Sequence, residues 1–277
     1  MIRINNVKLQ LGFTEADVRS VIKKTLKTDK EFEYIFFKLS LDDRRRNQVK
    51  YIASIDVDVP NPEKLLKRLQ MDAPGTYHHS LMVSNLCEAA AEAIGADPIL
   101  ARVGALYHDI GKLKRPLFFV ENQSYFLIEN PHNKFTPRIS KMIITAHPKD
   151  GIEIAKEYRL PQVVQNFIIQ HHGEGLASYF YNQAVQEEGV ENVKEEQFRY
   201  PGPKPNTKET AILMIADAVE SAVRSLKNPT PEEIENMINK IIVERLNDGQ
   251  LSDSPLTLKD IKTIAATFSR ILRGCLL

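Results

Sequence analysis

Histidines placed on apolar stripes are the first residues of this sequence that suggest chemistry. The chain has seven histidines, and five of them lie where a helix is expected to begin or end, beside apolar residues. His79, for example, shares a helix face with Met82 and Leu86. A buried imidazole without a partner costs about 1–3 kcal/mol. One such histidine alone is best explained as a satisfied core residue, but five in the same setting indicate a common centre.

Two aspartates accompany these histidines. Asp109 follows His108 directly at the end of an expected helix, and Asp217 lies within the apolar run AILMIADAV. A carboxylate in such surroundings is costly unless a cation balances its charge. Glu220 and Arg224 share the expected helix face of Asp217, so an ion pair is the alternative explanation for its burial. With the histidines present, a metal ion is the favoured partner.

Together these side chains form a set of candidate metal ligands. Imidazole mixed with carboxylate suits Mn, Fe, Co or Zn, whereas Ca and Mg prefer oxygen ligands alone. The set exceeds what one ion accepts, so the sequence predicts two ions that share one carboxylate. Two ions about 3.5–4 Å apart are a common device for displacement at phosphorus. The candidates are His79, His108, Asp109, His147, His171, His172 and Asp217.

The elements expected to carry these ligands follow a separate N-terminal region. The strands 2–11, 31–41 and 48–59 and the helix 15–27 are predicted before the Pro60-Asn61-Pro62 punctuation. After it, nearly every segment has helical periodicity with start and stop signals. The predicted fold is therefore mainly α, with a small α+β module of βαββ order at 1–60 and a helical bundle at 61–277.

Three predicted boundaries in the helical region bear on the site. One helix is expected over 76–94, closed by Gly95. The next begins after Asp97 and is expected to end at Gly111. The loop 199–206 (RYPGPKPN) should be irregular, because its closely spaced prolines exclude both helix and central strand.

Composition limits the function classes. A net charge of +1 does not suggest a protein that binds DNA or RNA polymers, although a small anionic ligand needs only local positive charge. Cys87 and Cys275 are the only cysteines, so no disulfide framework is expected and a reducing cytoplasm fits best. The longest apolar runs fall short of the ~18–20 residues that span a bilayer. The N-terminus also reads as a strand rather than a signal peptide, so a soluble chain is expected.

The run YHDIGK at 107–112 resembles the defining motif of the HD superfamily of metal-dependent phosphohydrolases. The whole of 72–277 is similar to the cytoplasmic HD domain of the seven-transmembrane-receptor HD family, the PgpH type. This similarity is carried by segments such as ENPHNKFTPRIS, QHHGEGLASYFYNQA and RLNDGQLSDSPLTLKDI. The resemblance implies an HD-domain helical bundle that hydrolyses cyclic di-AMP to the linear dinucleotide 5′-pApA, using two transition-metal ions.

The same resemblance implies how the ligands are shared. Asp109 should bridge the two ions, and His78 and His132 should lie outside the set. Mn and Fe both accept these ligands. One ion would be held by His79, His108, Asp109 and Asp217, and the other by Asp109, His147, His171 and His172.

The expected reaction is attack by a metal-bridging hydroxide on one phosphorus, in line with the departing 3′-oxygen. Lys112, one turn beyond Asp109, is expected to contact a non-bridging phosphate oxygen. Its alternative is a solvated lysine in the run KLKR. Arg115 and Arg138 are further candidates for the second phosphate or a base. The oligomeric state stays open.

The first sixty residues depart from this family. The family carries its HD domain after a membrane region, which this sequence lacks. The segment LSLDDRRRNQVKYIASIDVDV instead faintly resembles the N-terminal part of some uncharacterised FAD-dependent oxidoreductases. The glycine fingerprint of flavin binding is absent, so no flavin is expected and the region is interpreted as an accessory module.

Three other functions compete with the expected one. The HD-GYP branch, which acts on cyclic di-GMP, carries a GYP motif where this chain has Gly173-Glu174-Gly175-Leu176. A mononucleotide phosphohydrolase would manage with fewer histidine ligands. A non-catalytic HD domain that senses a nucleotide should have lost some ligands, and none is missing here.

Overall fold

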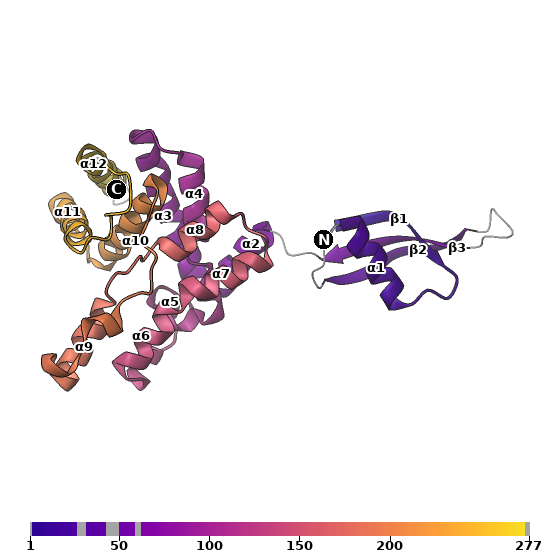
Figure 1. Cartoon of the computed structure of the whole chain (residues 1–277), viewed down its shortest axis with the longest axis horizontal. Coiled ribbons are helices and arrows are strands. Elements are labelled where there is room, and N and C mark those ends of the chain that lie inside the picture. Colours follow the sequence, from indigo (N-terminus) through magenta and orange to yellow (C-terminus); the bar gives the residue numbers. More distant parts are fainter. Residues whose placement is uncertain (1, 27–31, 43–49, 59–61, 275–277) are drawn as a thin grey trace. The chain divides into compact units, whose positions relative to one another are not determined.

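The computed structural model describes residues 2–26, 32–42, 50–58 and 62–274. The chain divides into two compact units, Met1–Asn61 and Pro62–Leu277. The first is a small α+β unit, and the second is almost entirely helical (Figure 1). The predicted mainly α fold with a βαββ segment at its N-terminus is confirmed. Pro60, Asn61 and Cys275, which carried predictions from the sequence, lie outside the described residues.

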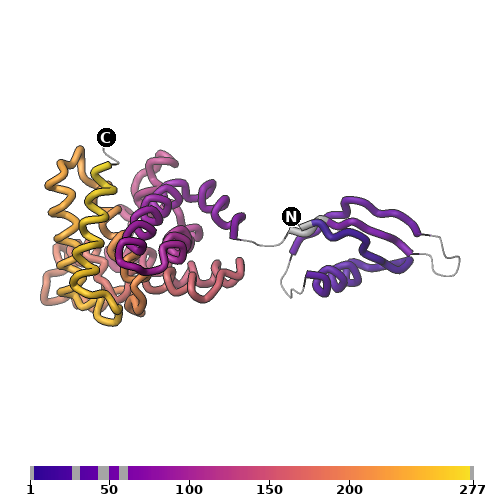
Figure 2. The backbone as a smooth tube through the Cα atoms, turned by 90° about the horizontal axis from the view of Figure 1, so that it is seen from above, coloured from indigo at the N-terminus to yellow at the C-terminus, as the bar shows by residue number. Residues whose placement is uncertain are grey.

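The N-terminal unit is a three-stranded antiparallel sheet with one helix on one face (Figure 2). Strands β1 (Ile2–Gln10), β2 (Glu33–Asp42) and β3 (Lys50–Asp58) pair in the order β1-β3-β2, and the helix is α1 (Glu15–Leu26). Val18 and Ile22 of α1 are fully buried in one cluster with Ile55 of β3. The pairing of β1 with β3 shifts register between Ile4 and Val7. Because of this shift, the side chains of both residues lie in that cluster.

The second unit is built of α-helices joined by short 3₁₀ turns. Its α-helices are α2 (Pro62–Asp72), α3 (Pro74–Ala93), α4 (Pro98–Tyr107), α5 (Val120–Phe126), α6 (Pro137–Thr145), α7 (His147–Glu157), α8 (Gln162–Gln170), α9 (Ser178–Glu188), α10 (Lys208–Ser225), α11 (Pro231–Asn247) and α12 (Leu258–Gly274). Its 3₁₀ turns are η1 (Ile110–Lys114), η2 (Pro116–Phe118), η3 (Pro131–Lys134), η4 (Val190–Asn192) and η5 (Glu195–Phe198). Among the described helices, none is long and apolar enough to cross a membrane.

The two largest apolar clusters of this unit hold most of its helices together. The larger one joins α3, α4, α10, α11 and α12, and includes the fully buried Leu86, Ile215 and Phe268. The other joins α2, η1, α7 and α8 through residues such as Leu69 and Ile168. Helix α10 is apolar on nearly every face, as expected for a helix enclosed by others. The helices that carry the predicted ligands are divided between these two clusters, and their packing fixes the site.

The helix that carries the HD doublet ends earlier than the sequence predicted. Helix α4 stops at Tyr107, and the chain turns into η1 instead of continuing to Gly111. Close packing explains this difference, because a Cβ on Gly111 would lie 1.8 Å from the carbonyl oxygen of His147. Only glycine permits this approach, which brings Asp109 beside the start of α7. The predictions of a helix over 76–94 and an irregular loop at 199–206 are confirmed.

Candidate metal centre

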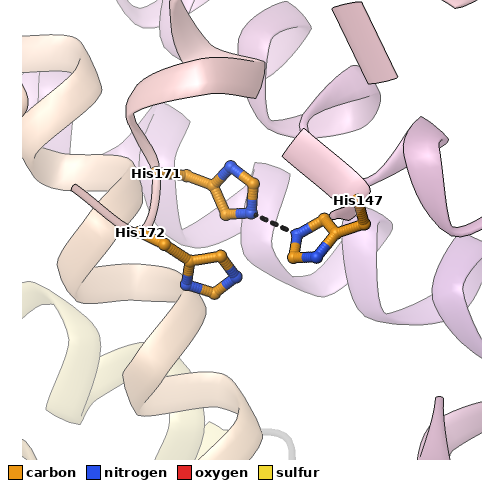
Figure 3. Close-up of side chains that lie close together, drawn as sticks. All are labelled: His147, His171 and His172. Atoms are coloured by element: carbon orange, nitrogen blue, oxygen red, sulfur yellow. Dashed lines mark hydrogen bonds between the residues drawn. The ribbon is translucent and has the colours of Figure 1, made fainter. Parts of the chain in front are cut away.

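The predicted ligands lie in two neighbouring groups. In each group the nitrogen and oxygen atoms that could bind a metal lie within 4.8 Å of one another. We call the first group the tetrad, which consists of His79, His108, Asp109 and Asp217. We call the second group the triad, which consists of His147, His171 and His172 (Figure 3).

Asp109 lies between the tetrad and the triad. Its Oδ2 is 3.2 Å from Nε2 of His108 and 3.7 Å from Nε2 of His79. Its Oδ1 is 3.3 Å from Nε2 of His147 and 3.5 Å from Nε2 of His171. One carboxylate therefore presents one oxygen to each group, which is the arrangement that a shared ligand requires.

The other contacts complete each group. Asp217 Oδ1 is 2.9 Å from Nε2 of His79, and its Oδ2 is 3.9 Å from Nδ1 of His172. In the triad, the Nε2 atoms of His147 and His171 point toward each other at 3.0 Å (Figure 3). Asp217 thus faces imidazoles. The ion pair that the sequence offered as the alternative explanation for Asp217 instead joins Glu220 and Arg224.

Unsatisfied buried atoms at the centre test whether a metal fits. Within the described part of the chain, Oδ1 of Asp109 and Nε2 of His108 are buried without a hydrogen-bond partner, whereas Oδ2 of Asp109 pairs with the ammonium of Lys112. A buried acceptor without a partner is costly, and a metal ion would satisfy these atoms. The donor types, imidazole and carboxylate, suit a divalent transition metal. The cluster therefore indicates divalent metal binding.

Electrostatics differ between the two groups. Burial lowers the pKa of His108, but the charges of Asp109 and Asp217 outweigh burial and raise this pKa to about 10. In the triad burial prevails, and it lowers the pKa of His171 to about 4 and that of His172 well below its usual range. His171 and His172 are therefore neutral imidazoles, which is the form that binds metal.

The carboxyl groups respond in the opposite sense. Burial raises the pKa of Asp109, but His108 and Lys112 outweigh it and hold this pKa well below its usual range. Burial likewise raises the pKa of Asp217, and hydrogen bonds to His108 and His79 hold it well below the usual value. Both carboxyls are therefore ionised at neutral pH.

Comparison with known proteins identifies the family. A family model described as HD domain matches residues 76–222. The chain belongs to the HD domain family. It is 50% identical over 219 residues to the cyclic-di-AMP phosphodiesterase PgpH of Bacillus subtilis, and equally so to that of Listeria monocytogenes. Each match covers 79% of this chain and 30% of the relative, so the chain spans less than a third of these relatives.

A solved structure agrees with this assignment. The crystal structure of the L. monocytogenes PgpH HD domain in complex with cyclic-di-AMP has 50% sequence identity and a TM-score of 0.73. The match covers 76% of this chain and 97% of that one. The resemblance read from the sequence is therefore confirmed, and the HD doublet is His108-Asp109.

Three imidazoles of this HD domain are oriented by the backbone. Each donates from Nδ1 to the carbonyl three residues earlier, and all three stand where a helix ends. The last carbonyls of a helix lack intrahelical partners and can accept such a bond. Each Nε2 is thereby left free to face Asp109. The distances are 2.6 Å for His108, 2.7 Å for His147 and 2.8 Å for His171.

Lys112 lies against the tetrad side of Asp109. Its Nζ is 2.7 Å from Asp109 Oδ2 and 2.8 Å from Oε1 of Glu121. Burial lowers the pKa of Lys112, but these two carboxylates outweigh it and keep the side chain an ammonium. Lys112 is therefore a largely buried cation and not the solvated lysine of the alternative interpretation. Glu121 was missed from the sequence, because it belongs to no recognised motif.

The two arginines predicted to bind substrate have acidic partners. Arg115 Nη1 is 3.3 Å from Oδ2 of Asp150. Arg138 donates to Glu188 at 2.9 Å and to Gln197 at 2.6 Å. Neither pairing involves the tetrad or the triad, so their contact with substrate stays a prediction.

Residues outside the predicted set also shape the site. His78 and His132 belong to neither group. Tyr200 stacks on His172 with ring centroids 4.2 Å apart. From the sequence, the loop 199–206 was predicted only to be irregular. An aromatic residue beside its prolines was the one signal that could have pointed to Tyr200 as part of the site. Glu220 contacts His79, and no local sequence signal identifies this contact between α3 and α10.

Proposed function

We propose that this protein is a di-metal phosphodiesterase that hydrolyses cyclic di-AMP to the linear dinucleotide 5′-pApA. The division of the Asp109 oxygens between the tetrad and the triad is the observation that carries this proposal. A shared carboxylate holds two ions close together, as displacement at a phosphodiester requires.

The choice of substrate rests on the relatives. Two proteins that are 50% identical over 219 residues are named cyclic-di-AMP phosphodiesterases, and a similar HD domain was crystallised with cyclic-di-AMP. All seven predicted ligands lie in the tetrad or the triad, which favours catalysis over nucleotide sensing alone. We place the reaction in the cytoplasm, in keeping with a composition that predicts no disulfide framework.

In this proposal the tetrad and the triad each hold one ion, and Asp109 contributes to both. Mn and Fe are the proposed metals, because both accept mixed imidazole and carboxylate ligands. When bound, the ions would activate a water molecule and neutralise charge on the phosphoryl oxygens. Lys112 contacts a non-bridging oxygen with its ammonium, while Arg115 and Arg138 serve the second phosphate or a base.

Chromatography of the products tests the proposal. Mn-loaded protein is incubated separately with cyclic di-AMP, cyclic di-GMP and mononucleotides, with the Asp109→Ala variant as control for contaminating enzymes. We expect cyclic di-AMP to be converted to 5′-pApA by the wild type only. Preference for cyclic di-GMP or for a mononucleotide would contradict the substrate, and binding without turnover would favour a sensor.

We further propose that residues 61–277 form the phosphohydrolase domain and 1–60 an accessory module. All predicted ligands lie in the second unit, and the match to the solved HD domain covers 97% of that chain but 76% of this one. A chain beginning at Pro62 should fold and keep its metal and its activity. Circular dichroism measures its fold, elemental analysis its metal, and chromatography of the products its activity. Loss of metal and activity would mean that the module completes the domain.

A further inference from the structure

His79 of the tetrad cannot be oriented by a backbone carbonyl as His108, His147 and His171 are. His108, His147 and His171 stand at helix ends, where a free backbone carbonyl accepts from Nδ1. His79 lies inside α3, where the carbonyls are occupied by the helix's own hydrogen bonds. Its Nδ1 therefore needs a partner from another element, or the ring is free to turn and to change its tautomer.

Glu220 supplies that partner from α10. Its Oε2 accepts a hydrogen bond from Nδ1 of His79, and its side chain is only 7% exposed. Its other oxygen, Oε1, lies 3.2 Å from Nε of Arg224. Glu220 follows Asp217 by three positions, so both carboxylates lie on the same face of α10. This helix thus offers one carboxylate to the metal centre and a second to the imidazole beside it.

We propose that Glu220 is the positioning residue for His79. By accepting from Nδ1–H, the carboxylate fixes the tautomer in which Nε2 is unprotonated and faces Asp109 and Asp217. A carboxylate behind a metal-bound imidazole also makes the ring a stronger donor to the metal. Arg224 holds the carboxylate in place from the exposed side. The inference rests on the proposed metal site, but not on the identity of the substrate.

The competing explanation is that Glu220 only forms a structural ion pair with Arg224. The two explanations differ in which partner matters for metal binding. Three variants of the full chain separate them. Glu220→Met keeps the length of the side chain but removes the acceptor, and Glu220→Gln keeps an acceptor without the charge. Arg224→Met removes the ion pair and leaves the contact between His79 and Glu220.

Mn(II) affinity is measured for each variant by equilibrium dialysis, with elemental analysis for the number of ions and the unfolding temperature of the metal-free protein as a stability control. In Glu220→Met, one of two Mn(II) ions should bind about 10- to 100-fold more weakly, the usual effect of removing an outer partner. Glu220→Gln should lose less affinity than Glu220→Met. Arg224→Met should bind Mn(II) almost as the wild type does.

Each other outcome overturns the inference. Unchanged Mn(II) affinity in Glu220→Met, or an equal loss in Arg224→Met, would leave the ion pair as the role of Glu220. If Glu220→Met does not fold, the glutamine variant decides, and affinity equal to that of Arg224→Met overturns the proposal. A wild type without bound Mn(II) would instead overturn the proposed metal site itself, together with this inference.

Discussion

The tetrad and the triad differ in how their ligands balance charge. The tetrad contains two carboxylates, Asp109 and Asp217, beside two imidazoles. The triad consists of imidazoles alone, and the nearest negative charges are Oδ1 of Asp109, 3.3 Å from His147, and Oδ2 of Asp217, 3.9 Å from His172. A divalent ion in the tetrad would therefore be balanced by more negative charge than one in the triad, which would keep more of its positive charge.

This difference suggests a division of labour in the proposed reaction. Opposite charges in a buried site attract strongly, so the tetrad should hold its ion more tightly. An ion that keeps positive charge polarises water and phosphoryl oxygens more strongly, so the triad should contribute more to the chemistry. One residue, Asp109, joins the two groups, so mutations can test the difference between them.

The largest effect is expected when the shared residue is removed. Asp109→Ala takes a ligand from each ion and also the charge between them. Elemental analysis should find most of the metal lost, and hydrolysis of cyclic di-AMP should fall to background. Retention of two metals per chain would contradict the role of Asp109 as a bridge.

Much of this site could be predicted because its signals are local. The periodicity around His79 and the apolar run around Asp217 identify buried polar residues from their neighbours in sequence. The end of α4 and the partner of His79 could not be read in this way. They depend on contacts between distant segments, such as Gly111 with His147 and Glu220 with His79.

A smaller effect is expected when one group is damaged and the other is left intact. Asp217→Asn weakens the tetrad, and His171→Ala removes a ligand from the triad. Each variant should keep one metal per chain by elemental analysis. Activity should fall by more than the roughly 10- to 100-fold typical of outer partners, because a direct ligand is lost. If either variant loses both ions, the two groups do not bind independently.

Chelation of the wild type should separate the groups without mutation. As chelator is added, the ion in the triad should leave first, because fewer charges hold it. The metal content should therefore pass through a plateau of one ion per chain, and activity should disappear before that plateau is reached. The ion remaining in His171→Ala should resist chelator as this tighter ion does. A single transition for both ions would contradict the difference in affinity.

The smallest effect is expected at Lys112, where no ion should be lost. Its Nζ lies 2.7 Å from Oδ2 of Asp109, the oxygen that faces the tetrad. An ammonium has no lone pair and cannot bind a metal, so Lys112→Ala should keep two ions. The variant should instead lower kcat on the order of 10²-fold, as expected for one lost contact to a developing charge.

A neighbouring lysine provides the matched control for this last prediction. Lys114 is more exposed and pairs with Asp150 at 3.1 Å, away from the tetrad and the triad. Lys114→Ala should therefore leave both kcat and metal content unchanged. Loss of metal in Lys112→Ala would mean that this cation organises the ligands, as its contacts with Asp109 and Glu121 permit. Full activity would mean that it does not touch the phosphate, and the ammonium would then serve only to balance two buried carboxylates.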